Sequence, residues 1–273
     1  MKVKVAGKIN LDLYVTGTRD NLHTLDSVMT SVSVYDRVSV KRARRTVVYE
    51  NGKVADLSCP AYRAINAFER RYGPVRVIVK IKKGIPFSSG MGGSSADSAA
   101  VLFCLGALYA KTVGPDLALL AGSDTPFMLY GGTLLVGGVG EKLKRLPHKR
   151  FKMLLVKHGE SLNAKEVYAR YDRLAKKSSG RTVPYSTTNF NEYLLSAQND
   201  LYDAVAPATS ISEVKSLIEQ TNPLKVQLTG SGPAFFAIYP SNKDLRAAKK
   251  VLDTQGLELV KVIRTKRQGI TLI

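Results

Sequence analysis

Alternating apolar and polar residues dominate the first third of the chain. Valine, isoleucine and tyrosine recur at every second position, as they do in strands with one buried face. This pattern predicts strands at residues 1–5, 11–16, 28–34, 36–41 and 75–82. Residues 59–72 place apolar side chains at helical spacing and end at Gly73-Pro74, which predicts a helix and its stop. A second helix is expected from about Ser95 to Lys111, and because it is apolar nearly all round, it should be buried.

The second half mixes short strands with amphipathic helices. Strands are predicted at residues 153–156, 224–228 and 234–239, and a helix over 244–254. Two further helices are expected to begin at Asn163, reaching about Lys177, and at Ser210, because each residue precedes a glutamate by three positions, as in a capping box. The pattern predicts an α+β protein with two domains, residues 1–150 and 151–273, and no flexible linker between them.

Composition excludes several classes of protein. The 273 residues are 44% hydrophobic and 23% charged, which is typical of a globular protein rather than a disordered or fibrous one. The longest apolar runs, 99–110 and 131–139, are shorter than a membrane span, so we expect a soluble, cytoplasmic protein. Two cysteines and three scattered histidines make neither a disulfide framework nor a zinc site.

The charge balance leaves two kinds of partner open. Lys plus Arg at 41 against Asp plus Glu at 22 gives 41 − 22 = +19, which suits nucleic acid or a small polyanionic substrate. Basic residues gather at 41–45, 142–152 and 243–267, where apolar residues interrupt the last two clusters at helix or strand spacing. Solvated faces of amphipathic elements explain this spacing better than a dedicated nucleic-acid groove.

A loop rich in glycine and serine carries the strongest chemical signal. In residues 85–100, IPFSSGMGGSSADSAA, the loop follows a predicted strand and opens the buried helix. Glycines let backbone N–H groups approach a polyanion, and a helix N-terminus adds partial positive charge. We therefore expect a phosphate-binding loop, although it is neither a Walker A motif nor Gly-x-Gly-x-x-Gly.

Two other segments are weaker signals alone. Lys8 and Asn10 lie between two predicted strands, where apolar residues are usual. Residues 228–239, LTGSGPAFFAIY, place a Gly-Ser-Gly turn between two predicted strands, as many hairpins do.

In this order the three segments resemble the GHMP kinase superfamily of small-molecule kinases, over nearly the whole chain. Within it, the segments 7–11 (GKINL), 15–19 (VTGTR), 23–25 (HTL), 121–127 (AGSDTPF) and 199–201 (NDL) are similar to the 4-diphosphocytidyl-2-C-methyl-D-erythritol kinases of non-mevalonate isoprenoid biosynthesis. The resemblance implies a ribosomal S5 domain 2-like ATP-binding half, a ferredoxin-like second half and an active site between them.

The resemblance also implies roles for individual residues. Asp124 would accept a proton from the 2-hydroxyl of the polyol, and Lys8 would stabilise the developing negative charge. ATP and Mg²⁺ would be required, with nucleotide contacts from Lys83, Pro86, Gly90, Met91, Gly92, Gly93, Ser94, Ser95 and Asp97, and with Ser95 as the metal ligand. The acceptor, a phosphorylated polyol, would contact Asn10, His23, Tyr168, Thr229, Gly230 and Ser231.

Several positions depart from the family pattern. Leu22 stands where a tyrosine usually stacks on cytosine, which leaves Tyr168 to cover the other side of the base. Ala61 replaces an asparagine near the adenine, and Ser94 replaces a glycine of the loop. Two alternatives therefore stay open: a GHMP kinase with another acceptor, such as mevalonate, homoserine or a sugar, and a non-catalytic relative that binds nucleic acid. We expect no membrane partner and a monomer or homodimer.

Overall fold

The computed structural model describes residues 1–159, 162–176, 178–207 and 209–273. The strands are β1 Lys2–Asn10, β2 Tyr14–Arg19, β3 Leu22–Arg42, β4 Val47–Glu50, β5 Lys53–Val54, β6 Val77–Lys82, β7 Thr133–Gly138, β8 Lys142–Arg145, β9 Lys152–Lys157, β10 Lys225–Leu228, β11 Phe235–Ile238, β12 Leu259–Lys266 and β13 Ile270–Leu272. The helices are α1 Pro60–Tyr72, α2 Gly93–Tyr109, α3 Pro115–Leu119, α4 Thr125–Tyr130, α5 Ala164–Arg173, α6 Phe190–Ser196, α7 Tyr202–Val205, α8 Thr209–Glu219 and α9 Asn242–Leu252.

The long strand β3 organises the first half. It pairs antiparallel with β1, β2, β6, β7 and β12. Its 21 residues join the two strands predicted at 28–34 and 36–41, because Tyr35 and Asp36 continue the alternation, with Asp36 fully buried. Val3 pairs with Val38, and Val38 pairs with Ile81. These buried residues therefore line up across three strands and form one apolar face.

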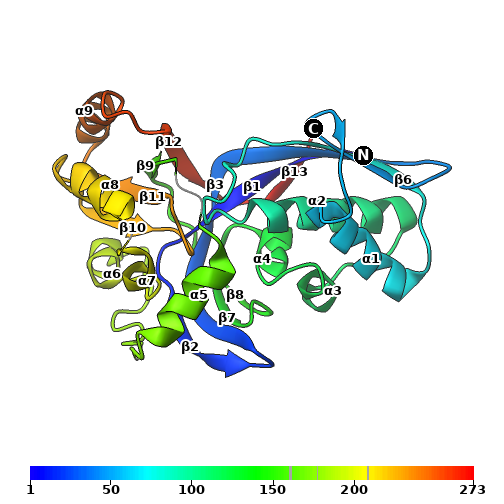
Figure 1. Cartoon of the computed structure of the whole chain (residues 1–273), viewed down its shortest axis with the longest axis horizontal. Coiled ribbons are helices and arrows are strands. Elements are labelled where there is room, and N and C mark those ends of the chain that lie inside the picture. The colour runs from blue at the N-terminus through cyan, green and yellow to red at the C-terminus, as the bar shows by residue number, and fades with distance from the viewer. Residues whose placement is uncertain (160–161, 177, 208) are drawn as a thin grey trace.

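Helices α1 to α4 cover that apolar face and leave the opposite face of β1, β3 and β6 open (Figure 1). Helix α2 is buried along most of its length, as its apolar sequence predicts, and packs against α1, α4 and β3. Helix α1 instead buries one stripe, which includes Ala64, Ile65 and Phe68. Because the helices pack on the sheet in this way, the N-terminus of α2 lies beside the C-terminal end of β1.

The second half builds its own core around the antiparallel sheet β10-β11-β9-β12. Strand β12 joins the two halves, since Ile263 pairs with Met153 of β9 and Thr265 pairs with Val32 of β3. Strand β13 then pairs with β1. The end of the chain thus returns to the first half, while the boundary expected near residue 150 stays a prediction.

Element ends differ from the sequence predictions where capping decides them. Helix α8 begins at Thr209, so Ser210 lies inside it and is not its cap. Helix α9 begins earlier than predicted because the Ser241 hydroxyl accepts hydrogen bonds from two N–H groups of its first turn. Asn163 caps α5 as predicted, but the helix ends at Arg173; the expected end at Lys177 lies outside the described residues. In the part of the chain that the structure describes, each helix is too short or too polar to cross a membrane.

Gly131 sets the contact between α4 and the turn that precedes β13. It ends α4 with φ of 58°, and a Cβ added there would lie 2.0 Å from the backbone nitrogen of Gly269. The carbonyl of Gly269 accepts a hydrogen bond from the N–H of Ala6 in β1. A side chain at position 131 would therefore push this turn away from β1.

Gly131→Ala is expected to lower the free energy of unfolding by about 3 kcal/mol or more, because left-handed backbone strain adds to the steric clash. Gly73→Ala is the matched control: its φ is 86°, and no atom lies within 4 Å of the added Cβ. The control should lose less, about 1–2 kcal/mol, because it meets only the cost of a backbone conformation that side chains rarely adopt. Urea unfolding of both variants measures the difference, and equal losses would contradict the proposed close contact.

Candidate active site

Lys8 and Asp124 face each other at the end of β1. Lys8 Nζ lies 3.4 Å from Asp124 Oδ2, and the Lys8 side chain is only 4% exposed. Asp124 precedes α4, and its side chain keeps 29% exposure. The pair thus joins a buried cation to a carboxylate that a solute can reach. A proton acceptor that acts beside a positive charge needs both properties.

Neighbouring polar groups hold the Lys8 side chain in place. Lys8 Nζ donates a hydrogen bond of 2.5 Å to Asn10 Oδ1, and Asn10 Nδ2 donates to the Ser27 hydroxyl at 2.9 Å. The backbone N–H of Asn10 donates to Thr229 Oγ1 at 3.2 Å. All these groups are buried, so the ammonium has a defined position rather than the freedom of a surface lysine.

The glycine-rich loop packs directly against this pair. Gly90 and Gly92 both have φ of 72°, a conformation that favours glycine. A Cβ on Gly92 would lie 3.4 Å from both Asp124 Oδ2 and Lys8 Cε, and the N–H of Lys8 donates to the carbonyl of Met91. The loop backbone and the Lys8–Asp124 pair are therefore in van der Waals contact.

The N-terminus of α2 opens at the same place. Gly93 begins the helix, Ser94 is exposed, and Ser95 is half-buried. The first N–H groups of a helix have no acceptor within the helix and attract anions. Ser95 Oγ points toward the Asp124 segment, since a Cβ on Gly122 would lie 3.4 Å from it. The local chemistry suits a phosphate group.

The Gly-Ser-Gly turn closes the site from the second half of the chain. A Cβ on Gly230 would lie 3.0 Å from Lys8 Nζ and 2.9 Å from the carbonyl oxygen of Gly90. Asn199 Nδ2 holds the turn by donating to the carbonyls of Leu228 and Gly230, each at 2.9 Å. The structure therefore brings the three sequence segments together around Lys8.

Lys83 and Asp97 lie beneath the loop rather than at its surface. Lys83 Nζ is 2.5 Å from Asp36 Oδ2 and 2.6 Å from Asp97 Oδ2, and Asp97 is 1% exposed. Asp36 Oδ1 accepts the N–H groups of Gly84 and Ile85. These bonds anchor the loop to β3, and a nucleotide contact from Asp97 stays a prediction. Met91 is also fully buried, and the carbonyl of Pro86, at the start of the loop, accepts the Ser89 hydroxyl.

Two carboxyl groups share the single ammonium of Lys83. Burial, followed by the negative charge of Asp36, raises the pKa of Asp97 to about 8. Asp97 Oδ1 is buried without a hydrogen-bond partner among the described residues. Burial alone would lower the pKa of Lys83, but the two carboxyl groups outweigh it and raise that pKa. Asp97 thus holds a proton more tightly than an ordinary carboxyl group, and Lys83 holds its proton more tightly than an ordinary lysine.

His23 and Tyr168 form a second part of the site. Their rings stack with centroids 4.6 Å apart, and His23 Nε2 lies 2.8 Å from Asp172 Oδ1. This spacing leaves no room for a base between the two rings, so a bound base must lie beside the stack or separate it. Leu22, on the strand next to His23, is 51% exposed.

Sequence patterns missed Arg181, which supports the site from a loop. Its guanidinium makes two hydrogen bonds to the fully buried Asp12, at 2.8 and 2.9 Å, and also pairs with Asp26. Tyr193 donates to Asp12 as well, at 2.8 Å. The Ser27 hydroxyl, which binds Asn10, donates to the carbonyl of Asp12 and so links this network to Lys8. The partners lie more than 150 residues apart, so no local pattern could reveal them.

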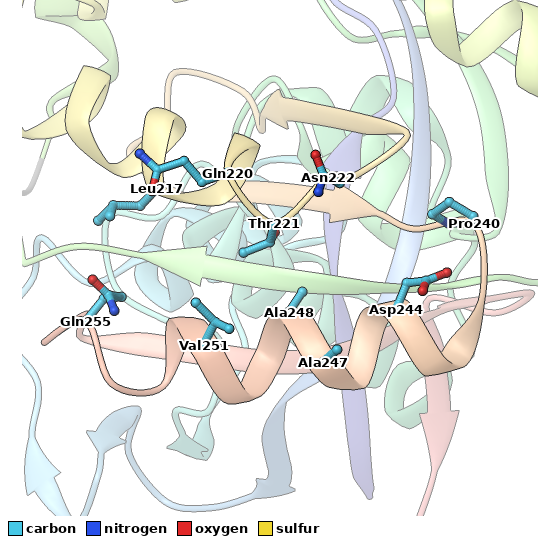
Figure 2. A pocket seen from close by; sticks show the side chains of 10 residues that line it. All are labelled: Leu217, Gln220, Thr221, Asn222, Pro240, Asp244, Ala247, Ala248, Val251 and Gln255. Carbon is cyan, nitrogen blue, oxygen red and sulfur yellow. The ribbon is translucent and has the colours of Figure 1, made fainter.

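The cavity between α8 and α9 is a separate feature (Figure 2). It measures about 560 Å³ and is lined mainly by small and polar side chains. None of the residues discussed above contributes to its lining.

Comparisons with known proteins agree with the geometry. Residues 60–132 match the model of the GHMP kinases N terminal domain. A 4-diphosphocytidyl-2-C-methyl-D-erythritol kinase from Thermoanaerobacter pseudethanolicus is 32% identical over 261 residues, 91% of this chain and 90% of that protein. One from Desulfitobacterium hafniense is 36% identical over 249 residues, covering 85% and 84% of the two chains.

Solved structures give the same result for the fold. A crystal structure of 4-(cytidine 5'-diphospho)-2C-methyl-D-erythritol kinase superposes with a TM-score of 0.77 at 26% identity, covering 97% of this chain and 99% of that one. The mevalonate kinase of Methanococcus jannaschii superposes with a TM-score of 0.70 at 14% identity, covering 97% and 98%. The second similarity concerns the fold alone.

Asp97→Asn should flatten the dependence of stability on pH. A carboxyl with a raised pKa holds its proton more tightly when folded, so it stabilises the protein at low pH. That stabilisation is lost as pH rises from the ordinary value of 3.8 toward about 8. Urea unfolding between pH 5 and 8 should show the native protein losing stability faster than the variant, by up to roughly 1 kcal/mol per pH unit. Asp56→Asn, at a fully exposed aspartate, is the control and should leave the slope unchanged. Parallel slopes for native protein and Asp97→Asn would rule out a protonated Asp97.

Proposed function

The chain belongs to the 4-diphosphocytidyl-2-C-methyl-D-erythritol kinase family, and on that premise we propose that it transfers the γ-phosphoryl group of ATP to the 2-hydroxyl of 4-diphosphocytidyl-2-C-methyl-D-erythritol. The observation that carries the proposal is the Lys8–Asp124 pair, 3.4 Å apart, in contact with the glycine loop at the N-terminus of α2. A carboxylate, a fixed ammonium and a phosphate-binding helix end are the parts that phosphoryl transfer to an alcohol needs.

Asp124 accepts the proton of the acceptor hydroxyl in this mechanism. Its partial exposure leaves room for a substrate oxygen, and Lys8 orients the carboxylate. Lys8 also faces the negative charge that develops on the attacking oxygen and on the transferred group. An ammonium held by Asn10 and Asp124 supplies this stabilisation without reorganising.

The loop and the start of α2 bind the nucleotide phosphates. Backbone N–H groups of Gly92, Gly93 and Ser94 surround the helix end, where phosphate oxygens replace the missing acceptors. Mg²⁺ neutralises charge on the phosphates when bound, and Ser95 Oγ is our candidate for its protein ligand. The described residues contain no cluster of three or more acidic, histidine or cysteine side chains suited to a metal.

The acceptor occupies the side of the pair formed by the second half. Gly230 approaches Lys8 from this side, and the half-buried Ser231 next to it can orient a polyol and its diphosphate. Asn10 and Thr229 are fully buried and support this turn through the hydrogen bond between them. We assign the cytidine ring to the neighbourhood of His23 and Tyr168, where two aromatic rings and an imidazole nitrogen can recognise a base.

We also infer a reducing compartment, such as the cytoplasm, because Cys59 and Cys104 are buried free thiols. A monomer or homodimer remains our proposal for the oligomeric state.

Lys8→Ala and Asp124→Asn should each lower kcat by about a thousandfold or more, because each removes a group that acts only on the reacting atoms. Binding of a fluorescent ATP analogue should change little. Lys249→Ala and Asp253→Asn, which break a solvent-exposed ion pair on α9, are the matched controls and should keep full ADP release. If Asp124→Asn keeps its turnover, Asp124 is not the proton acceptor. If the native protein phosphorylates mevalonate but not the cytidylated polyol, only the assignment of the acceptor substrate is wrong.

Leu22→Tyr should lower KM for the cytidylated polyol about tenfold, since the variant gains an aromatic face for the base. Leu22→Ile, which alters shape without adding a ring, should leave KM near the native value. ADP-release assays across acceptor concentrations compare the three proteins. If Tyr and Ile behave alike, the base does not bind beside position 22.

A further inference from the structure

The open face of the first sheet carries a dense set of basic side chains. Helices α1 to α4 lie on the other face, as Figure 1 shows, so β13, β1, β3, β6 and β4 present one side to solvent. Side chains on this side come from alternate residues of each strand. Its cations, which we call the basic sheet face, are Lys2, Lys4, Arg37, Lys41, Lys80 and Lys82.

Strand register arranges these cations in rows. Lys4 pairs with Arg37, and Arg37 pairs with Lys82 on the next strand. In the neighbouring row Lys2 pairs with Ser39, and Ser39 with Lys80. Paired strands lie about 5 Å apart and alternate residues about 7 Å apart, so the cations cover an area roughly 10 by 13 Å. This area is larger than a single phosphate group requires.

No acidic side chain offsets this charge on the face. The acidic residues of these strands within the described chain are Asp26, Asp36 and Glu50. Asp26 pairs with Arg181, Asp36 is fully buried with Lys83, and Glu50 lies in register with the buried Ile81. In the part of the chain that the structure describes, the six cations make no ion pair with a carboxylate side chain. Six like charges that form no such ion pair repel one another and favour a polyanionic partner.

Two tyrosine rings lie among the cations. Lys4 Nζ is 5.2 Å from the Tyr35 ring centre, and Lys80 Nζ is 5.9 Å from that of Tyr49. Both rings are half-buried on the same side of the sheet. A shallow groove of about 610 Å³ crosses this side, lined by Lys2, Arg37, Ser39, Asn51, Gly52, Lys80, Lys82 and Ile273, together with Val38 and Ile81.

We propose that the basic sheet face binds single-stranded nucleic acid. Phosphates pair with the rows of cations, and unstacked bases lie against the tyrosine rings, which combines the two interactions that single strands use on protein surfaces. The rings favour a single strand over a duplex, whose bases are already stacked and paired. The residues of this face are separate from Lys8, Asp124 and the glycine loop, so this binding is independent of the kinase reaction.

Fluorescence anisotropy with a labelled 20-nucleotide single-stranded RNA tests the proposal. The logarithm of the affinity should fall linearly with the logarithm of salt concentration, with a slope of about −0.7 per phosphate contacted, hence about −4 for six contacts. The triple variant Arg37→Gln, Lys80→Gln and Lys82→Gln should reduce this slope by about 2 and weaken binding at least tenfold in 0.1 M salt. Its kinase turnover should stay native.

A matched control distinguishes RNA binding at the basic sheet face from attraction by the overall charge of the protein. Lys243→Gln, Arg246→Gln and Lys250→Gln remove the same number of charges from exposed positions on α9 and should bind RNA like the native protein. Equal loss in both triple variants would reduce the effect to net charge and overturn the proposal.

Tyr49→Leu tests the stacking part. It should weaken single-strand binding at least fivefold and leave the weaker binding of a duplex of the same length unchanged. A duplex that binds as tightly as the single strand would contradict the proposal. Binding to phosphatidylserine vesicles in place of RNA, lost in the sheet-face variant, would assign the face to a membrane and also overturn it.

Discussion

Close contact between two stretches of glycine backbone is the constraint on which the active site depends. Gly90 lies so near the Gly-Ser-Gly turn that a Cβ there would come within 2.0 Å of the Thr229 carbonyl oxygen. Because both segments approach this closely, Lys8 is enclosed between them and kept near Asp124. The two segments are about 140 residues apart, so the fold must be complete before the catalytic pair exists.

Three layers of support fix that contact. Lys83 ties the loop and α2 to β3 through Asp36 and Asp97. Asn199 fixes the turn through two backbone carbonyls, and the Arg181–Asp12 pair anchors the strand end that carries Asn10. Each layer uses buried charges or amides with several partners, an arrangement that specifies geometry more than it adds stability. The reacting groups themselves remain few and accessible.

Sequence patterns predicted the parts of this arrangement that are local. Alternation located β1, β3 and β6, and the glycine-rich stretch before an apolar helix located the phosphate-binding loop. Patterns failed for β12, whose exposed lysines and arginines resemble a basic surface cluster, and for β7, whose two glycines weaken the strand signal. Arg181 was not predicted at all, because its pairing with Asp12 and Asp26 across more than 150 residues leaves no periodicity. Lys83 and Asp97 were named from the family resemblance, but their pairing with each other and with Asp36 was not predicted. The roles of Lys8 and Asp124 rested on family resemblance, and the structure adds their proximity.

Phosphoryl transfer in this protein depends on the position of one proton acceptor and one cation relative to the substrate. A crystal structure with a non-hydrolysable ATP analogue and the cytidylated polyol tests it most directly. Asp124 Oδ should lie within about 3.2 Å of the acceptor hydroxyl, with Lys8 Nζ beside the same oxygen and the triphosphate at the N-terminus of α2. A substrate bound with its hydroxyl turned away from Asp124, or a triphosphate held elsewhere on the protein, would contradict it.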